Sequence, residues 1–202
     1  MKQVQKFSKL WMAIMVFGSL SFTNPPAGGS YQVNAAQSMV QWKGYKVTGE
    51  HYGVVSLQSG TLELDDKGMF TAGSFVVDMG SITVQDIQGG GKEKLEGHLK
   101  SDDFFGVGNH PTARFQTTRV ISRGKPGEYK VIGNMTIKNI TKEIKFDAVV
   151  QETDGQLTAT ATLKLDRSDY DVRFGSGSFF DELGDRTIYD EFDLVVQLKA
   201  GK

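Results

Sequence analysis

Apolar and polar side chains alternate along most of the chain after residue 30. Over residues 157–165 one face of the chain is wholly apolar and consists of Leu157, Ala159, Ala161, Leu163 and Leu165. The same period of two is present over residues 144–150 and 192–198. Because successive side chains of a β-strand point to opposite faces, this pattern predicts strands with one buried and one solvated face.

Further strands of this kind are predicted over residues 37–48, 53–64, 69–78, 112–122 and 128–138. Only residues 92–100 have helical character, because Leu95 and Leu99 stand four positions apart. A sheet of about eight antiparallel strands must close into a barrel or stack as a sandwich to bury its apolar face. The alternation alone leaves both architectures open.

Composition narrows the class of protein. The chain has 24 glycines and 4 prolines, which agrees with many tight turns, and it has no cysteine. The lack of cysteine excludes a disulfide framework, a thiol nucleophile and a thiolate metal site. A formal net charge of −1 without a basic cluster argues against nucleic acid as a partner and against electrostatic docking on an anionic membrane.

The N-terminus has the pattern of an export signal. Lys2, Lys6 and Lys9 precede an apolar run over residues 10–20. This run is shorter than the roughly 20 apolar residues that a transmembrane helix needs. We therefore predict a signal peptide over residues 1–21, with cleavage between residues 21 and 27, in preference to an N-terminal core helix. The expected location is the bacterial periplasm or the medium, without stable membrane insertion after the signal is removed.

The residues that usually carry catalysis are sparse. His51, His98 and His110 lack metal-ligand spacing, and no hydrolase elbow, phosphate-binding loop or zinc-protease motif is present. Carboxylates such as Asp102 are typical of caps, turns or arginine partners. We predict no catalytic residue, no metal and no cofactor. The alternative is a secreted enzyme with His51 or His98 within hydrogen-bond reach of an acid such as Asp102, inside a pocket.

Several motifs follow one another in the order of a known family. The chain reads WKG at 42–44, GEHYG at 49–53, GSFVVDMGSI at 73–82, LEGHLKSDDFF at 95–105, HPTARF at 110–115, GNMTIKNITK at 133–142 and DRSDY at 166–170. This series, from about Tyr31 to Leu198, resembles the YceI-like family of polyisoprenoid-binding, lipocalin-like bacterial proteins. Asn139 replaces a turn glycine of that pattern, which is tolerable because asparagine accepts positive φ.

The resemblance implies an all-β fold: an eight-stranded antiparallel lipocalin-like β-barrel over residues 31–200, with a short helix near its mouth. It also favours an interior cavity, to which small inward residues such as Ala113, Gly133 and Ala148 would contribute. We predict a ligand-binding lining of Trp42, Phe75, Phe115, Met135, Ile137, Phe146, Ala148, Ala159, Ala161 and Leu163. At the mouth, Leu99, Phe104, Phe105, Phe179 and Phe180 are expected to gate access, and His51, His98 and Arg167 to meet a polar headgroup.

The predicted function is sequestration or transport of a long apolar lipid, such as an isoprenoid, a polyprenyl quinone-like compound or a fatty-acid derivative. Besides the enzyme, a ligand-free envelope stress protein with a solid core stays open as an alternative. Pairing of edge strands into a homodimer is a further possibility that the sequence does not specify.

Overall fold

The computed structural model describes residues 28–202, and the export signal predicted over residues 1–21, with its cleavage between 21 and 27, lies outside this range. The described chain has nine strands: β1 Gly29–Val33, β2 Met39–Lys46, β3 Gly49–Leu64, β4 Phe70–Val84, β5 Thr112–Ser122, β6 Glu128–Ile137, β7 Ile140–Thr153, β8 Gln156–Asp166 and β9 Ile188–Gly201. Between β4 and β5 lies the helix α1, Gly90–Lys100. The helix predicted over 92–100 is thus confirmed.

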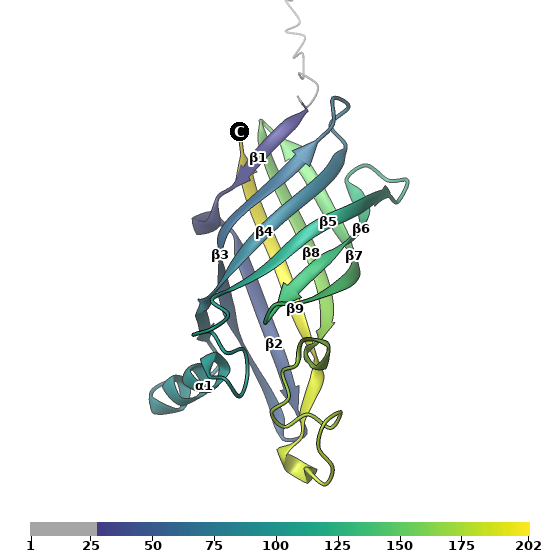
Figure 1. Cartoon of the computed structure of the whole chain (residues 1–202). Helices are drawn as coiled ribbons and strands as arrows, with labels where there is room; N and C mark the ends of the chain where they lie inside the picture. The colour runs from purple at the N-terminus through teal and green to yellow at the C-terminus, as the bar shows by residue number, and fades with distance from the viewer. Residues whose placement is uncertain (1–27) are drawn as a thin grey trace, which may run out of the picture.

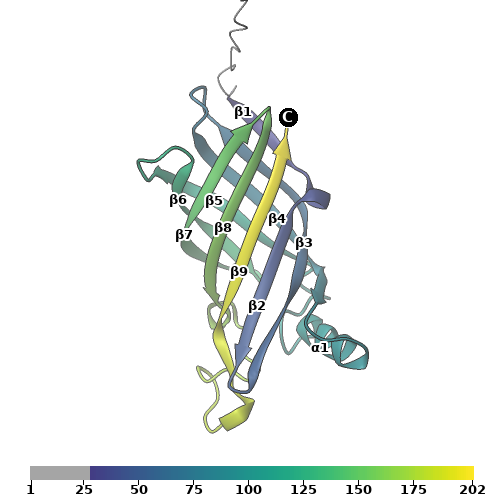
Figure 2. The same cartoon turned by 180° about the vertical axis from the view of Figure 1, so that it is seen from behind.

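The strands form one closed antiparallel barrel (Figures 1 and 2). Adjacent strands in the wall follow the order β3-β2-β9-β8-β7-β6-β5-β4, and β4 also pairs with β3, which closes the ring. β1 and β2 pair with the same two neighbours, β3 and β9, so together they fill a single position in the wall. The predicted eight-stranded barrel is therefore confirmed, and the sandwich is excluded.

One strand departs clearly from its predicted bounds. β4 was expected to end at residue 78, but it continues to Val84. Its pairing with β3 jumps from Asp78 to Thr83, so a bulge interrupts the ladder. The buried side chain before the jump is the odd-numbered Met79, whereas those at its end are the even-numbered Ile82 and Val84. Because the inward-facing positions change from odd to even numbers, the second part of the strand does not continue the alternation of the first part and was not predicted. At the β6–β7 turn Asn139 has φ 61°, as expected for a residue in place of glycine.

The two ends of the barrel differ. Near the chain termini the interior is packed by Tyr31, Leu62 and Leu157, which are at most 1% exposed. The opposite end carries α1 and the β8–β9 loop (residues 167–187) (Figure 1). The N–H of Val84 donates to the Glu96 carboxylate over 2.8 Å, which ties α1 to the end of β4. In the part of the chain that the structure describes, no helix is long and apolar enough to cross a bilayer.

Candidate ligand cavity

Two adjoining cavities lie inside the barrel. Chamber 1, on the side of α1, has a volume of ≈ 180 Å³, and chamber 2, toward the packed end, has a volume of ≈ 110 Å³. Four side chains belong to both walls: Val40, Val77, Met135 and Leu194. We call these four residues the waist, because they border both chambers.

Chamber 2 has an almost wholly apolar wall. Seven of the predicted lining residues lie in its wall alone: Phe75, Phe115, Phe146, Ala148, Ala159, Ala161 and Leu163. Ala148 on β7 pairs with Ala161 on β8, and Ala159 pairs with Val150, so small side chains gather on adjacent strands. The chamber is empty where these alanines leave the space that larger residues would fill.

Aromatic rings fill the other side of chamber 2. The Phe115 ring lies 5.4 Å from the Phe146 ring and 6.3 Å from the Phe75 ring, centre to centre. A Cβ atom at Gly133 would lie only 2.4 Å from the Phe115 ring. The expectation that Gly133 widens the cavity is therefore wrong, since its missing side chain is the space that the Phe115 ring occupies.

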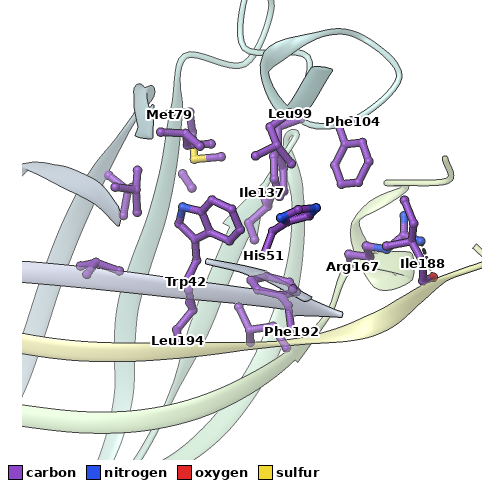
Figure 3. A pocket seen from close by; sticks show the side chains of 18 of the residues that line it. Trp42, His51, Met79, Leu99, Phe104, Ile137, Arg167, Ile188, Phe192 and Leu194 are labelled. Carbon is purple, nitrogen blue, oxygen red and sulfur yellow. Dashed lines mark hydrogen bonds between the residues drawn. The ribbon is translucent and has the colours of Figure 1, made fainter. Parts of the chain in front are cut away.

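Chamber 1 contains the remaining predicted lining residues, Trp42, Met135 and Ile137. Six of the predicted mouth residues also lie in its wall: His51, His98, Leu99, Phe104, Phe105 and Arg167 (Figure 3). Among the described residues, the Trp42 indole Nε1 is buried without a hydrogen-bond partner. Such a donor is energetically unfavourable unless a ligand supplies an acceptor.

His51 is held by a carboxylate that the sequence did not single out. Its Nδ1 lies 2.7 Å from Oδ2 of Asp86, whose Oδ1 accepts from the N–H of Tyr52. Burial opposes ionisation of Asp86, but the hydrogen bonds with His51 and Tyr52 outweigh it, so the pKa of this carboxyl lies below its usual value. The pair is 35 residues apart, and only the β3–β4 pairing brings it together.

The alternative of an enzyme required His51 or His98 within hydrogen-bond reach of an acid such as Asp102, and the acid that His51 meets is Asp86. Asp102 accepts from the Asn109 side chain over 3.5 Å, whereas the His98 ring packs edge-on against Phe104 and Phe174. Of the residues that line chamber 1, none is a serine, threonine or cysteine. The histidine–carboxylate pair of His51 and Asp86 therefore has no serine, threonine or cysteine beside it in the described wall, whose hydroxyls belong to Tyr45 and Tyr189.

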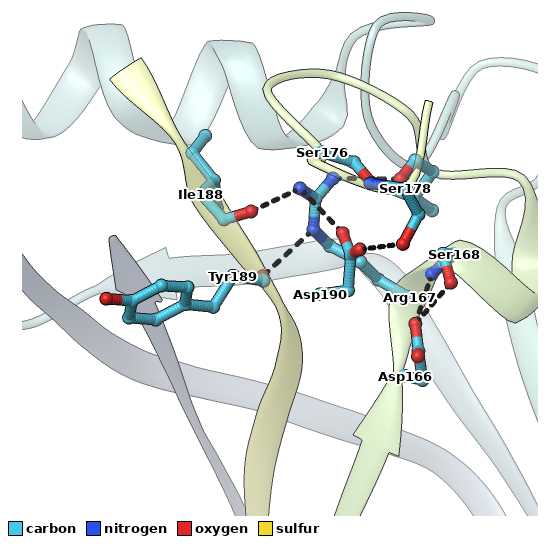
Figure 4. Close-up of polar contacts among 9 residues, drawn as sticks. Asp166, Arg167, Ser168, Ser176, Ser178, Ile188, Tyr189 and Asp190 are labelled. Carbon is cyan, nitrogen blue, oxygen red and sulfur yellow. Dashed lines mark hydrogen bonds and ion pairs between the residues drawn. The ribbon is translucent and has the colours of Figure 1, made fainter. Parts of the chain in front are cut away.

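Arg167 has a structural role instead of the predicted contact with a headgroup. Its guanidinium donates to the carbonyl oxygens of Val172, Ile188 and Tyr189 over 2.8, 2.9 and 3.2 Å, and its Nη2 lies 3.2 Å from Asp190 (Figure 4). The side chain is only 3% exposed, and this burial lowers the pKa of Arg167. These contacts fasten the β8–β9 loop to β9, so its donors are already engaged.

Phe179 and Phe180 line neither chamber, although their loop lies at the α1 end of the barrel, where the mouth was predicted. They are 40% and 49% exposed, and the Arg173 guanidinium lies 4.9 Å from the centre of the Phe179 ring. Both residues belong to the β8–β9 loop, which extends past the end of the barrel (Figure 1). Their gating of access stays a prediction. In the described chain, no cluster of three or more histidines or carboxylates is arranged to hold a metal ion.

Relatives in sequence cover the chain to different extents. A UPF0312 protein of Ectopseudomonas mendocina is 27% identical over 173 residues, which cover 80% of this chain and 86% of the relative. A UPF0312 protein of Pectobacterium carotovorum is 41% identical over 51 residues, or 25% of this chain. The chain thus spans about a quarter (26%) of the length of that relative.

Solved structures share the fold at low sequence identity. Burkholderia cenocepacia BcnA superposes with a TM-score of 0.66 at 20% identity, covering 83% of this chain and 99% of that one. A polyisoprenoid binding domain from Saccharophagus degradans gives 0.61 at 14% identity, covering 85% and 97%. The YceI-like domain family matches residues 31–200. Since this match includes every strand from β2 to β8 and nearly all of β9, the chain belongs to the YceI-like domain family.

Proposed function

We propose that this protein binds a single long apolar chain, that of an isoprenoid or a related lipid, in the two chambers of the barrel, and carries or sequesters it. The observation that supports this is the pair of apolar cavities that meet at the waist. The similar fold of a domain described as polyisoprenoid-binding, from Saccharophagus degradans, points the same way. We also propose a periplasmic or secreted location, which rests on the signal-like residues 1–21.

The chambers must widen to hold a long chain. A cavity of about 150 Å³ in another protein admits one benzene molecule, and the two chambers here measure ≈ 180 and ≈ 110 Å³. A chain that spans both must displace the waist. Met135 is the unbranched, flexible member of the waist, so we propose that it moves aside. Burial of the chain supplies roughly 0.8 kcal/mol for each CH₂ group.

We further propose that the ligand carries an uncharged oxygen at its head, as a quinone, a ketone or an alcohol does. The Trp42 N–H needs an acceptor, and His51 lies in the same wall with its Nδ1 engaged by Asp86, which leaves Nε2 for a ligand. Of the lysines and arginines in the described wall of chamber 1, Arg167 is engaged and Lys46 remains. One lysine is a poor match for a diphosphate, which is usually bound by several cations or backbone N–H groups.

Organic extraction of the purified protein, followed by mass spectrometry, tests the proposal. We expect one long-chain lipid per protein, and stripped protein should bind prenyl alcohols and quinones more tightly than prenyl diphosphates of the same length. A protein that is isolated empty and takes up none of these compounds would contradict lipid binding. A lipid that emerges chemically altered after incubation with the protein would instead favour an enzyme.

A further inference from the structure

The barrel wall is incomplete between β7 and β8. Their ladder starts beside the turn, at Thr153 opposite Gln156, and ends at Ala148 opposite Ala161. Beyond that point residues 140–147 of β7 pair only with β6, and residues 162–166 of β8 pair only with β9 (Figure 2). We call these two facing stretches the β7–β8 split. Their backbone groups on the facing edges lack ladder partners, so they are hydrated or free to move.

A second place where pairing stops early shows the contrast. The β4–β5 ladder ends at Ser74 opposite Gln116, but side chains bridge the strands beyond it. The N–H of Gly73 donates to Thr117 Oγ1 of β5 over 3.1 Å, and the N–H of Phe70 donates over 3.2 Å to the hydroxyl of Tyr129, which lies on the next strand, β6. Between residues 140–147 and 162–166, all of which the structure describes, no side-chain hydrogen bond or ion pair crosses; the bridges lie just past the end of β8, where Lys142 lies 3.4 Å from Asp169 and Lys138 donates to the Asp171 carbonyl. The split is therefore the weaker seam of the wall.

The charges on the outer face explain why the ladder stops. If the register of Ala148 opposite Ala161 continued, Lys145 would face Lys164 and Glu143 would face Asp166. Like charges directly opposite each other destabilise a strand pair. Each strand satisfies its lysine on its own side instead, since Lys145 lies 3.1 Å from Glu143, and Lys164 lies 3.1 Å from Glu191 on β9. The sequence thus disfavours closure of the split.

The inner face at the split is apolar. The same extension of the register would bring Phe146 opposite Leu163, and both side chains line chamber 2 together with Ala148 and Ala161. The split therefore lies directly beside chamber 2. A chain that reaches chamber 2 from chamber 1 must pass lengthwise through the waist, whereas a chain that moves through the split avoids it. The far end of the barrel offers no path, because Tyr31, Leu62 and Leu157 fill it.

We propose that the β7–β8 split is the lateral portal through which the lipid chain enters and leaves the barrel. This inference rests on the proposed function, since it concerns the route of the same ligand. The strands separate far enough for a chain to slide sideways between the apolar inner residues, and the like charges outside keep the seam from closing. The waist then contacts the lipid chain once it is inside, and the chain does not have to pass end-first between the waist residues.

A cross-link across the split tests the portal. The chain has no cysteine, so the double variant Lys145→Cys/Lys164→Cys carries a single reactive pair, which a short bis-maleimide can join across the split. The matched control is Thr158→Cys/Lys199→Cys, an exposed pair within the continuous β8–β9 ladder. The readout is the rate of uptake and release, by stopped flow, of a prenyl alcohol that carries a small fluorophore.

Joining β7 to β8 should slow both uptake and release by about tenfold or more while the Kd stays the same, because a gate changes rates and not the bound state. The control cross-link should leave both rates unchanged. Equal rates in the linked and unlinked split variants would overturn the portal and leave the α1 end as the route. Failure of the unmodified protein to bind the probe at equilibrium would contradict lipid binding itself, which keeps the two failures distinct.

A second pair of variants tests the portal without a cross-linker. Lys145→Glu places an opposite charge across from Lys164 and should favour closure, whereas Lys145→Gln removes the repulsion without adding attraction. We expect Lys145→Glu to be the slower of the two at low salt and the difference to shrink at high salt, where exposed charges are screened. Identical rates for both variants at every salt concentration would count against the portal.

Discussion

Filling chamber 2 should remove lipid binding while the barrel stays folded, and Ala159→Phe is the sharpest way to do so. Ala159 is 7% exposed, points inward from β8 and lies between Val150 and Leu198 on the neighbouring strands. The substitution adds one phenyl ring. A cavity of about 150 Å³ admits benzene, so this ring fills a chamber of ≈ 110 Å³ almost completely.

The expected loss of affinity follows from the volume of the chamber. A space somewhat smaller than a benzene cavity holds about one five-carbon isoprene unit. At roughly 0.8 kcal/mol for each buried CH₂ group, exclusion of that unit weakens binding by about 4 kcal/mol. This corresponds to about a thousandfold increase in Kd. Stability should change by less than about 2 kcal/mol, since the new ring replaces empty space and overpacking of the walls is limited.

The measurement is a titration with a fluorescent prenyl alcohol beside urea unfolding of the same samples. Ala161→Phe, at the next inward position on β8, should behave alike. Thr158→Phe is the matched control, because it adds the same ring to the same strand on the outer face. If Ala159→Phe folds normally and keeps its Kd within about threefold of the parent, the chain does not occupy chamber 2 and the reasoning fails.

Three other substitutions test separate features. Trp42→Phe removes the unpartnered indole donor and should weaken the binding of prenyl alcohols and quinones about tenfold. The binding of plain hydrocarbons should stay the same. An equal loss of affinity for both classes would exclude a ligand acceptor at Nε1. Tyr170→Phe removes a buried hydroxyl without a partner and should stabilise the protein by about 1 kcal/mol at pH 7. Burial raises the pKa of Tyr170 to about 12, above its unfolded value near 10. Between pH 10 and pH 12 the parent should therefore lose ~2–3 kcal/mol of folding stability that Tyr170→Phe does not lose. Parallel pH profiles of the two proteins in urea unfolding would contradict this. Gly133→Ala brings a Cβ to 2.4 Å from the Phe115 ring and 2.5 Å from the Gln116 carbonyl oxygen, and it should lower stability by about 2 kcal/mol, seen as a lower Tm; an unchanged Tm would show that ring and backbone both give way.

Alternation predicted most of the wall but could not show how it closes. The strand over 112–122 has the predicted bounds, although a shift of register between Thr117 and Arg119 interrupts its ladder with β6. β1 was missed because five residues are too few for a periodic signal, and its place beside β2 depends on pairing with β3 and β9. Closure itself depends on β1 and β2 pairing with β9, the last strand of the chain, which no local pattern contains.

The candidate site was predictable where it depends on the face of a strand and unpredictable where it depends on long-range contacts. The inward parity of Ala148, Ala159 and Ala161 follows from alternation, and all three line chamber 2. The role of Arg167 depends on carbonyl oxygens that lie up to 22 residues away, so its sequence context shows only a charge. Asp86 gave no signal for a similar reason, because its partner His51 is on a different strand.

The apolar walls and the lateral portal together explain how a carrier of this kind would exchange its cargo. The interior of a bilayer is about as apolar as a wall of leucine and phenylalanine, so moving the chain from barrel to membrane changes its free energy little. The balance then depends on the head, where the Trp42 N–H gains an acceptor only while the ligand is bound. A route between β7 and β8 lets the chain move sideways between apolar surfaces with little exposure to water, so the rate is set by strand separation and the affinity by the head and the chain length. For this reason the cross-linked split should alter rates alone, whereas Trp42→Phe and Ala159→Phe should alter Kd.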